Sequence, residues 1–460
     1  MTSSKRKTPK RRPLRWLWLS LGLTGVAITS AAAGALLAVG LASTPLLQSQ
    51  LSPEEEEVFS QGDRISTGVN FRLPRLTRPV NILVLGVKVL TSDIDDPVYD
   101  SDDLGYHALV NSFEGLSDTM LLIRLNPEGE QLTVLSLPRD TRTLVEDVGY
   151  TKLNEANRVG GPATSAIAVS DLLGGVEIDR YVRINVQGVE KLIDALGGVT
   201  LYVPQDMKYQ DDSQHLYINL QQGEQHLDGA EAMQFLRFRY DAYGDIGRVQ
   251  RQQTLMRALQ EQTLDPSTIA RLPQILSVIQ SHVDTNLSVE ELLALVGFAA
   301  GVERSEVQML MLPGDFSRSE QYSLSYWLPS QTGIRNLVAE YFDPGGLSLD
   351  EGDRVSRLAN SDDVDHRFLR IAIQDSTNDE DAVDAVLAAL SAKDYRNVHL
   401  GNDWGEPLAE TRIIAQKGDR MSATLLQRQL GFGEVRTEST GILDSDITIQ
   451  LGQDWQQHEF

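Results

Sequence analysis

The sequence of 460 residues contains no cysteine, and this absence excludes several kinds of chemistry. Without thiols the chain has no disulfide, no thiolate nucleophile and no cysteine-based zinc site. Its seven histidines show no metal-ligand spacing. The sequence also lacks a Gly-x-Ser-x-Gly motif, a Walker loop, a dinucleotide-binding fingerprint and internal repeats. The corresponding enzyme classes are therefore not indicated.

Basic residues are few beyond the N-terminus. The chain has 41 lysines and arginines against 65 aspartates and glutamates, which gives a net charge of −24. Residues 1–15 hold seven of the basic residues and no acid, so the remainder carries −31, which is −24 minus 7. A body this acidic repels nucleic-acid backbones. We therefore expect no nucleic-acid partner.

Charge is also missing from residues 16–43. A helix needs roughly 20 apolar residues to cross a bilayer, and this segment is longer. Because the basic residues 1–15 precede it and the acidic residues 54–57 follow, the positive-inside rule predicts a cytoplasmic tail and a single-pass anchor in the plasma membrane. The main domains are then extracytoplasmic (periplasmic). The alternative is a cleaved signal peptide, whose apolar core is usually shorter, about 7–15 residues, and small residues near 41–43 leave it open.

The rest of the chain predicts two α/β domains. Residues 44–78 are polar and indicate a stalk. In residues 79–344 strands alternate with helices, as in an α/β sandwich. Strands are expected at 81–86, 118–125, 131–137, 181–186, 200–203 and 307–312, and helices at 154–173, 189–196, 227–236, 248–262, 267–283, 288–301 and 333–342. The strands 118–125 and 131–137 flank a turn and predict a hairpin.

Residues 345–365, rich in Asp, Ser and Gly, indicate a linker to a small C-terminal α/β domain at residues 366–460. There we expect strands at 368–374, 398–400, 412–415 and 446–451, with helices at 378–393 and 421–430.

Six arginines at three places are the main functional signal. They are Arg139 and Arg142 in Ser136-Leu-Pro-Arg-Asp-Thr-Arg142, Arg237 and Arg239 in Leu236-Arg-Phe-Arg-Tyr240, and Arg248 and Arg251 in Gly247-Arg-Val-Gln-Arg-Gln-Gln253. Guanidinium forks bind phosphate oxygens with bidentate geometry. The pattern predicts a pyrophosphate or phosphoryl ligand, whereas the alternative is six separate solvated or salt-bridged surface residues.

Local placement favours the ligand. Arg139 follows the C-terminal end of a strand, the edge at which open α/β sheets bind ligands. Arg237 and Arg239 share a face if the chain is extended there. Arg248 and Gln252, four apart, share a face of a helix. Gly247 is expected to leave the N-terminus of that helix open to anions.

Three further charged residues are candidates. Asp118, at the start of a strand, is either a turn or capping residue or a Mg²⁺ ligand or base beside a pyrophosphate, because one or two carboxylates commonly hold Mg²⁺ together with substrate phosphates. Lys152 is either solvated or a second contact to the phosphates. Asp245 either steers Arg248 or, as we favour, caps the helix.

The order of these pieces resembles the LytR-CpsA-Psr family of cell-envelope proteins. The resemblance covers about residues 79–262, and residues 366–455 resemble a small C-terminal domain often attached to that family. The matching segments are 81–86, 117–120, 136–141, 152–154, 236–239 and 247–253. The resemblance implies an α/β/α sandwich with a mixed central sheet. It also implies a phosphotransferase of cell-wall biogenesis, which moves a glycan-phosphate from a polyprenyl pyrophosphate carrier onto peptidoglycan.

The resemblance also assigns roles to residues. It makes Asp118 a Mg²⁺ ligand or catalytic base and places Arg139, Arg237, Arg239 and Arg248 on the pyrophosphate. The further substrate-binding candidates are Lys88, Arg142, Lys152, Asn154, Asp245, Arg251 and Gln252. Two alternative functions stay open, a polyprenyl-pyrophosphate hydrolase and a non-catalytic envelope binder or attenuator-type regulator.

One departure bears on the metal. Lys88 stands where the family commonly has a metal-binding aspartate, and an ammonium group cannot ligate Mg²⁺. Lys88 would instead neutralise phosphate directly, or Asp93, Asp95 or Asp96 would replace the missing carboxylate.

Overall fold

The computed structural model describes the larger part of the chain after residue 50. The described residues are 51–59, 64–67, 74–88, 113, 115–211, 216–238, 245–263, 266–303, 306–318, 320–342, 369–442 and 444–457. The expected basic tail, membrane anchor and linker lie outside them. Over the described ranges, no helix has the length and apolar character that a membrane crossing requires.

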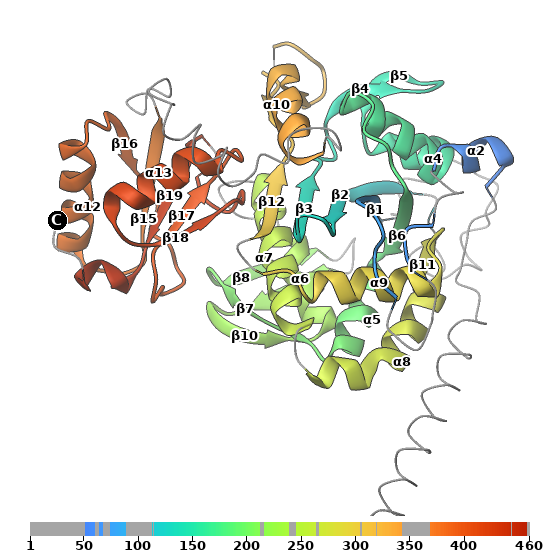
Figure 1. Cartoon of the computed structure of the whole chain (residues 1–460), viewed down its shortest axis with the longest axis horizontal. Helices are drawn as coiled ribbons and strands as arrows, with labels where there is room; N and C mark the ends of the chain where they lie inside the picture. The colour runs from blue at the N-terminus through green and yellow to red at the C-terminus, as the bar shows by residue number, and fades with distance from the viewer. Residues whose placement is uncertain are drawn as a thin grey trace, which may run out of the picture. The chain divides into compact units, whose positions relative to one another are not determined.

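A six-stranded mixed sheet forms the centre of the first domain (Figure 1). Its strands are β1 (Val80–Lys88), β2 (Leu116–Asn126), β3 (Gln131–Ser136), β6 (Arg180–Asn185), β11 (Val283–Thr285) and β12 (Val307–Met311). The order across the sheet is β11-β6-β1-β2-β3-β12. β1 is parallel to β6 and β3 to β12, while the other neighbours are antiparallel. The mixed sheet and the hairpin of β2 and β3 confirm the expectation from the sequence.

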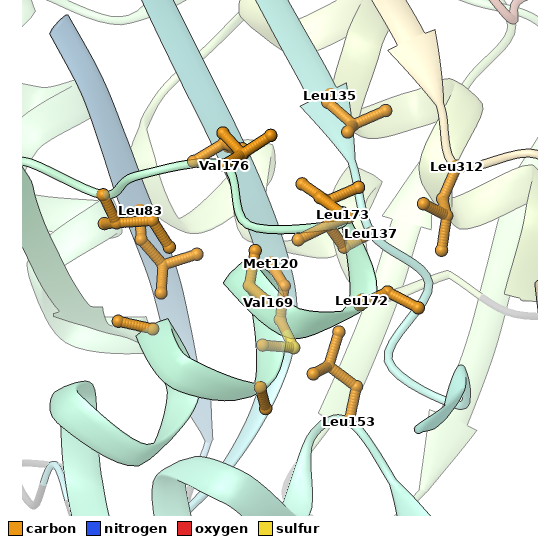
Figure 2. Close-up of a cluster of buried hydrophobic side chains, with 14 of the residues drawn as sticks. Leu83, Met120, Leu135, Leu137, Leu153, Val169, Leu172, Leu173, Val176 and Leu312 are labelled. Atoms are coloured by element: carbon orange, nitrogen blue, oxygen red, sulfur yellow. The ribbon is translucent and has the colours of Figure 1, made fainter. Parts of the chain in front are cut away.

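Both faces of this sheet are buried because apolar side chains alternate along its strands. On β1, Leu83 and Leu85 belong to one core and Ile82 to another. The first core is closed by α4 (Glu155–Leu172) and α10 (Gln331–Tyr341). Figure 2 shows Leu83 and Met120 of the sheet among side chains from the C-terminal end of α4. The sheet is therefore a rigid platform from which polar side chains at its edge can project.

Helices on the opposite face complete an α/β/α sandwich. α9 (Val289–Ala299) packs Ala294 and Leu295 against one half of that face. α7 (Asp245–Thr263) packs Met256 near Leu121 and Val134 on the other half. Through Leu255, α7 also joins a further core, built from α5 (Val186–Leu196), α6 (Gly229–Arg237) and the strands β7 (Val199–Val203), β8 (Met207–Asp211), β9 (Leu216–Leu220) and β10 (Gly223–Leu227). α7 is thus held from two directions.

Two buried ion pairs attach β6 to its neighbours. Arg183 lies 2.6 Å from Asp284 of β11, and Arg180 lies 2.8 Å from Glu291 of α9. Buried charges of this kind are strongly destabilising if one partner is removed. They account for two arginines that lie away from the three clusters.

The segment expected to be a stalk contributes to the folded domain. It contains the short helix α2 (Pro53–Glu57), which begins with a capping box at Ser52. Phe59 is buried, with its ring 5.1 Å from that of Tyr181. Ile65 is buried in the core that α9 covers. These described parts of residues 44–78 are therefore packed rather than free.

The C-terminal domain has its own five-stranded sheet and core. The strands β15 (Arg370–Asp375), β16 (Asn397–Leu400), β17 (Arg412–Ala415), β18 (Glu434–Arg436) and β19 (Ile447–Leu451) are ordered β16-β15-β19-β17-β18. The helices α12 (Glu380–Ala392) and α13 (Arg420–Leu430) bury Val386 and Leu426 against Ile373 and Ile449. This separate apolar core accounts for the second series of strand and helix patterns in the sequence after residue 366.

Two helices differ from expectation in detail. α4 is bent at Gly160 and Gly161, where Gly161 has a φ of 64° and Pro162 follows. α7 begins at Asp245 rather than at Arg248, so Asp245 is its first residue and not its cap. Gly247 lies inside the first turn, so the N-terminus of the helix begins two residues before it.

Candidate active site

Asp118 lies at a β-bulge between the C-terminal end of β1 and the N-terminal end of β2, two central strands of the sheet. Gly86 of β1 pairs with Thr119, but the next residue, Val87, pairs with Ser117, which leaves Asp118 without a partner in the register. Bulges re-aim side chains and are common beside active sites. Here Asp118, at the bulge, and its neighbour Thr119 both line one pocket.

Gly86 makes this arrangement possible. A Cβ atom at Gly86 would lie 2.9 Å from the Cβ atom of Thr119, closer than carbon atoms approach. The glycine that ends the apolar run of β1 is therefore needed for the close approach of the two strands at the bulge.

Arg139 meets Asp118 from the end of the neighbouring strand. β3 ends at Ser136, and Pro138 starts a turn in which the backbone N–H of Thr141 donates to the Pro138 carbonyl over 3.0 Å. The turn directs Nη1 of Arg139 to within 2.7 Å of Oδ1 of Asp118. Both side chains are about a fifth exposed. A charge-assisted hydrogen bond in a partly dry pocket is stronger than one on the surface.

The main chain of Asn154 holds both residues in place. Its N–H donates to the carbonyl of Arg139 over 3.1 Å, and its carbonyl accepts from the N–H of Ser117 over 3.4 Å. The Asn154 side chain is buried, and it does not line the pocket. The contribution of Asn154 that the structure describes is thus to fix the backbones on either side of the ion pair.

α7 closes the pocket from the opposite face. Arg248, which is buried, and Gln252 line the pocket together, so the helical face that their spacing predicted is confirmed. Nε2 of Gln252 donates to Oγ1 of Thr119 over 2.7 Å. This hydrogen bond joins α7 directly to the residue beside Asp118.

The pocket also has an apolar wall that the sequence did not indicate. Met311, Phe316 and Trp327 line it together with Leu137 and Val249. The rings of Phe316 and Trp327 pack edge to face with centroids 5.2 Å apart. Two arginines beside an apolar wall suit a ligand with an anionic head and an apolar tail.

The other expected residues lie in several places. Arg142 and Lys152 are outside the pocket, on a hairpin next to it. Arg251 is buried and donates to the carbonyl of Phe238. Arg237 is the last residue of α6, which is helical there rather than extended.

Arg239 lies outside the described residues, as do the side chains of Lys88 and Asp245. The roles expected of Arg239 and Lys88, and the steering of Arg248 by Asp245, therefore stay predictions.

A family model settles where the chain belongs. The model described as the LytR_cpsA_psr family matches residues 47–342. The chain belongs to the LytR-CpsA-Psr family. A second model, described as the LytR cell envelope-related transcriptional attenuator, matches residues 369–455. Both matches confirm the resemblance that the motifs indicated.

Several relatives of this LytR-CpsA-Psr protein carry names that state an activity. A protein of Bacillus cereus named polyisoprenyl-teichoic acid–peptidoglycan teichoic acid transferase TagU is 30% identical over 325 residues, which is 70% of this chain and 93% of the relative. The transferase TagV of Bacillus subtilis is 31% identical over 240 residues, 50% of this chain and 61% of the relative. The crystal structure of B. subtilis TagV aligns with a TM-score of 0.47 and 27% identity, covering 58% of this chain and 98% of TagV.

The pocket could hold a magnesium ion only if substrate phosphates supplied further ligands. Over the described part of the chain, no group of three or more histidines and acids gathers to hold a metal. Asp118 and Asp140 are the carboxylates that line the pocket, and Arg139 contacts both, at 2.7 and 3.7 Å. Because Mg²⁺ is commonly held by one or two carboxylates plus substrate phosphates, these residues suit a shared ion better than a resident one.

Replacing Gly86 with alanine should disturb the bulge. The added methyl group must push Thr119 and Asp118 away from β1. We expect this to lower the free energy of unfolding by about 1–3 kcal/mol, as at other overpacked sites. Binding of inorganic pyrophosphate, measured by titration calorimetry, should weaken as well. Gly297→Ala is the matched control, because nothing lies within 4 Å of a Cβ atom there and the residue is inside a helix. Unchanged stability and binding in Gly86→Ala would contradict this reading of the bulge.

Magnesium and pyrophosphate should bind cooperatively. We expect Mg²⁺ alone to bind weakly, and to tighten the binding of pyrophosphate when both are present, because the phosphates complete its coordination sphere. Asp118→Asn should remove this effect of Mg²⁺, whereas Asp384→Asn, an exposed acid of the C-terminal domain, should leave it intact. Tight binding of Mg²⁺ without pyrophosphate would show that a resident metal site exists instead.

Proposed function

We propose that this protein is a phosphotransferase that moves a glycan-phosphate from a polyprenyl pyrophosphate carrier onto peptidoglycan. The observation that carries the proposal is the convergence of Arg139 and Arg248, far apart in the sequence, on one pocket with Asp118. The names of the relatives support the same class of reaction, since TagU and TagV are described as transferring teichoic acid from a polyisoprenyl carrier to peptidoglycan.

The arginines would neutralise the diphosphate. Phosphoryl transfer requires in-line positioning and compensation of the charge on the non-bridging oxygens. In the described structure, Asp118 supplies the negative charge that Arg139 faces. A bound diphosphate replaces this carboxylate as the partner of Arg139, while Arg248 and Gln252 contact the phosphates from α7.

Release from Arg139 prepares Asp118 for a second role. Asp118 then accepts the proton of the acceptor hydroxyl, which must lie within hydrogen-bonding distance for Asp118 to act as a general base. The hydroxyl oxygen forms a bond to the glycan-bearing phosphorus atom, the bond from that atom to the bridging oxygen breaks, and polyprenyl phosphate leaves. Mg²⁺, when bound with the substrate, would add positive charge at the same oxygens.

The lipid part of the carrier needs an apolar surface. The apolar residues of α4 are used in the core on one face of the sheet, as Figure 2 shows for the C-terminal end of that helix, so we do not place the lipid there. On the α7 side, Val249, Met311 and Phe316 line the pocket next to the arginines. We therefore place the first isoprene units along this wall.

We also propose an extracytoplasmic location with a single N-terminal anchor. The proposal rests on the uncharged residues 16–43 and on the basic residues before them, and it brings the pocket to the side of the membrane where peptidoglycan lies.

A transfer assay with and without peptidoglycan distinguishes a phosphotransferase from a hydrolase. Polyprenyl pyrophosphate carrying a labelled glycan, incubated with the protein and Mg²⁺, should transfer label to added peptidoglycan. Without peptidoglycan, release of glycan-phosphate to water should be slow. Rapid release without acceptor would identify a hydrolase, and binding without turnover would identify a non-catalytic envelope protein.

In the same assay, Arg139→Ala and Arg248→Ala should each lower the rate of transfer by a factor on the order of 10³ or more, as loss of arginine contacts does in other phosphoryl transfers. Arg396→Ala, at an exposed arginine of the C-terminal domain, should retain the rate of the unaltered protein. Near-normal transfer by both pocket variants would refute the site.

A further inference from the structure

A cluster of tyrosines and cations lies beside the pocket and is not explained by binding of the diphosphate. It is built from the hairpin of β4 (Arg142–Val145) and β5 (Gly149–Lys152) and from the loop between β13 (Gly314–Phe316) and β14 (Trp327–Pro329). The residues next to the two segments are joined, because the N–H of Trp327 in β14 donates to the carbonyl of Asp140 over 2.9 Å and a bridge links Trp327 to Thr141, which precedes β4. The two segments therefore form one surface.

Stacking between rings and cations fixes the side chains of this surface. The guanidinium carbon of Arg142 lies 4.5 Å from the ring centre of Tyr150 and 5.2 Å from that of Tyr322. The ring of Tyr322 meets that of Tyr326 edge to face at 5.3 Å, and Nζ of Lys152 lies 5.9 Å from the Tyr326 ring. We call these five residues the tyrosine platform.

The platform is continuous with the pocket through Asp140. Oδ1 of Asp140 lies 2.9 Å from Nζ of Lys152, and Oδ2 lies 3.7 Å from Nε of Arg139. Asp140 lines the pocket, whereas Lys152 and Arg142 do not. Charges and rings thus run without interruption from the Asp118–Arg139 pair to Tyr150, which is 65% exposed.

The chemistry of the platform fits sugar rings better than phosphate or a membrane. Arg142 stacks on two rings and Lys152 is paired with Asp140, and neither residue lines the pocket in which the diphosphate is proposed to bind. The exposed acids Glu146 and Asp147 at the hairpin tip oppose binding to an anionic lipid surface. Tyrosine rings offer an apolar face to the C–H groups of a pyranose, and their hydroxyls and the nearby acids form hydrogen bonds with sugar hydroxyls.

We propose that the tyrosine platform binds the acceptor, a glycan strand of N-acetylhexosamines, and guides its hydroxyl to Asp118. This inference rests on the proposed function. The acceptor is the favoured occupant because the platform leads to the base Asp118, and because the surface extends over two segments, as an extended polymer requires. Rings already held by stacking lose little conformational freedom when a strand binds.

Equilibrium binding tests the platform separately from catalysis. The probe is soluble, uncross-linked peptidoglycan glycan strands, titrated against the full chain and against Tyr150→Ala and Tyr322→Ala. Each variant should bind the strands about three- to tenfold more weakly, since one aromatic contact is lost. Tyr217→Ala, at an exposed tyrosine of β9, should bind as the unaltered chain does.

A kinetic comparison identifies which glycan is held. The two platform variants should raise KM for the acceptor strand by the same factor, leaving kcat at saturating acceptor and KM for the donor unchanged, and Tyr322→Phe should restore most of the affinity. Unchanged strand binding in both alanine variants would overturn the proposal. A rise confined to the donor KM would assign the platform to the donor glycan, and weaker binding to anionic vesicles alone would assign it to the membrane; either result contradicts the acceptor site. If no transfer is found at all, the proposed function fails, but the titrations still decide the platform.

Discussion

The ion pair between Asp118 and Arg139 is the contact on which the pocket depends. It joins the ends of two neighbouring strands, and the main chain of Asn154 fixes the backbone on both sides of it. A partly buried charge is expensive to leave without a partner, so each group stabilises the other until a ligand takes over. A diphosphate is such a ligand, because it offers Arg139 more negative charge than a single carboxylate does. The ion pair therefore holds Arg139 in the position where it binds the diphosphate, and it keeps Asp118 from acting as a base until the diphosphate is bound.

The fold provides this contact with a rigid frame. Burial of both faces of the central sheet sets the positions of β1, β2 and β3, and the bulge opposite Gly86 turns Asp118 towards the pocket. α7 is packed against two cores, and it brings Arg248 to the same place from the other side of the sheet. Asp140 then links the pocket to the tyrosine platform, so one carboxylate stands between the proposed donor and acceptor surfaces.

Sequence patterns predicted the elements of the central sheet well because their signal is local. The apolar run of β1, the hairpin of β2 and β3 and the shared face of Arg248 and Gln252 follow from spacing alone. The bulge was not predicted, because a register shift depends on the partner strand. The start of α7 was placed too late, since Gly247 was taken as a boundary.

The apolar wall and the tyrosine platform were missed for a different reason. Phe316, Trp327, Tyr322 and Tyr326 lie in a stretch with little periodicity, and only long-range packing brings them next to Arg139 and Arg142. The motif Ser136-Leu-Pro-Arg-Asp-Thr141 did contain Asp140, the residue that makes the connection. The ion pair between Asp140 and Lys152 could not be predicted, because the two residues are far apart in the sequence.

In the proposed function, Arg139 and Arg248 bind one diphosphate together. A double-mutant cycle in the binding of a short-chain polyprenyl pyrophosphate, with Arg139→Ala, Arg248→Ala and the double variant, measures this directly. Two arginines on one ligand should be coupled, with an interaction energy of about 0.5–3 kcal/mol. If either single variant binds the pyrophosphate as tightly as the unaltered chain does, the two arginines do not share one diphosphate.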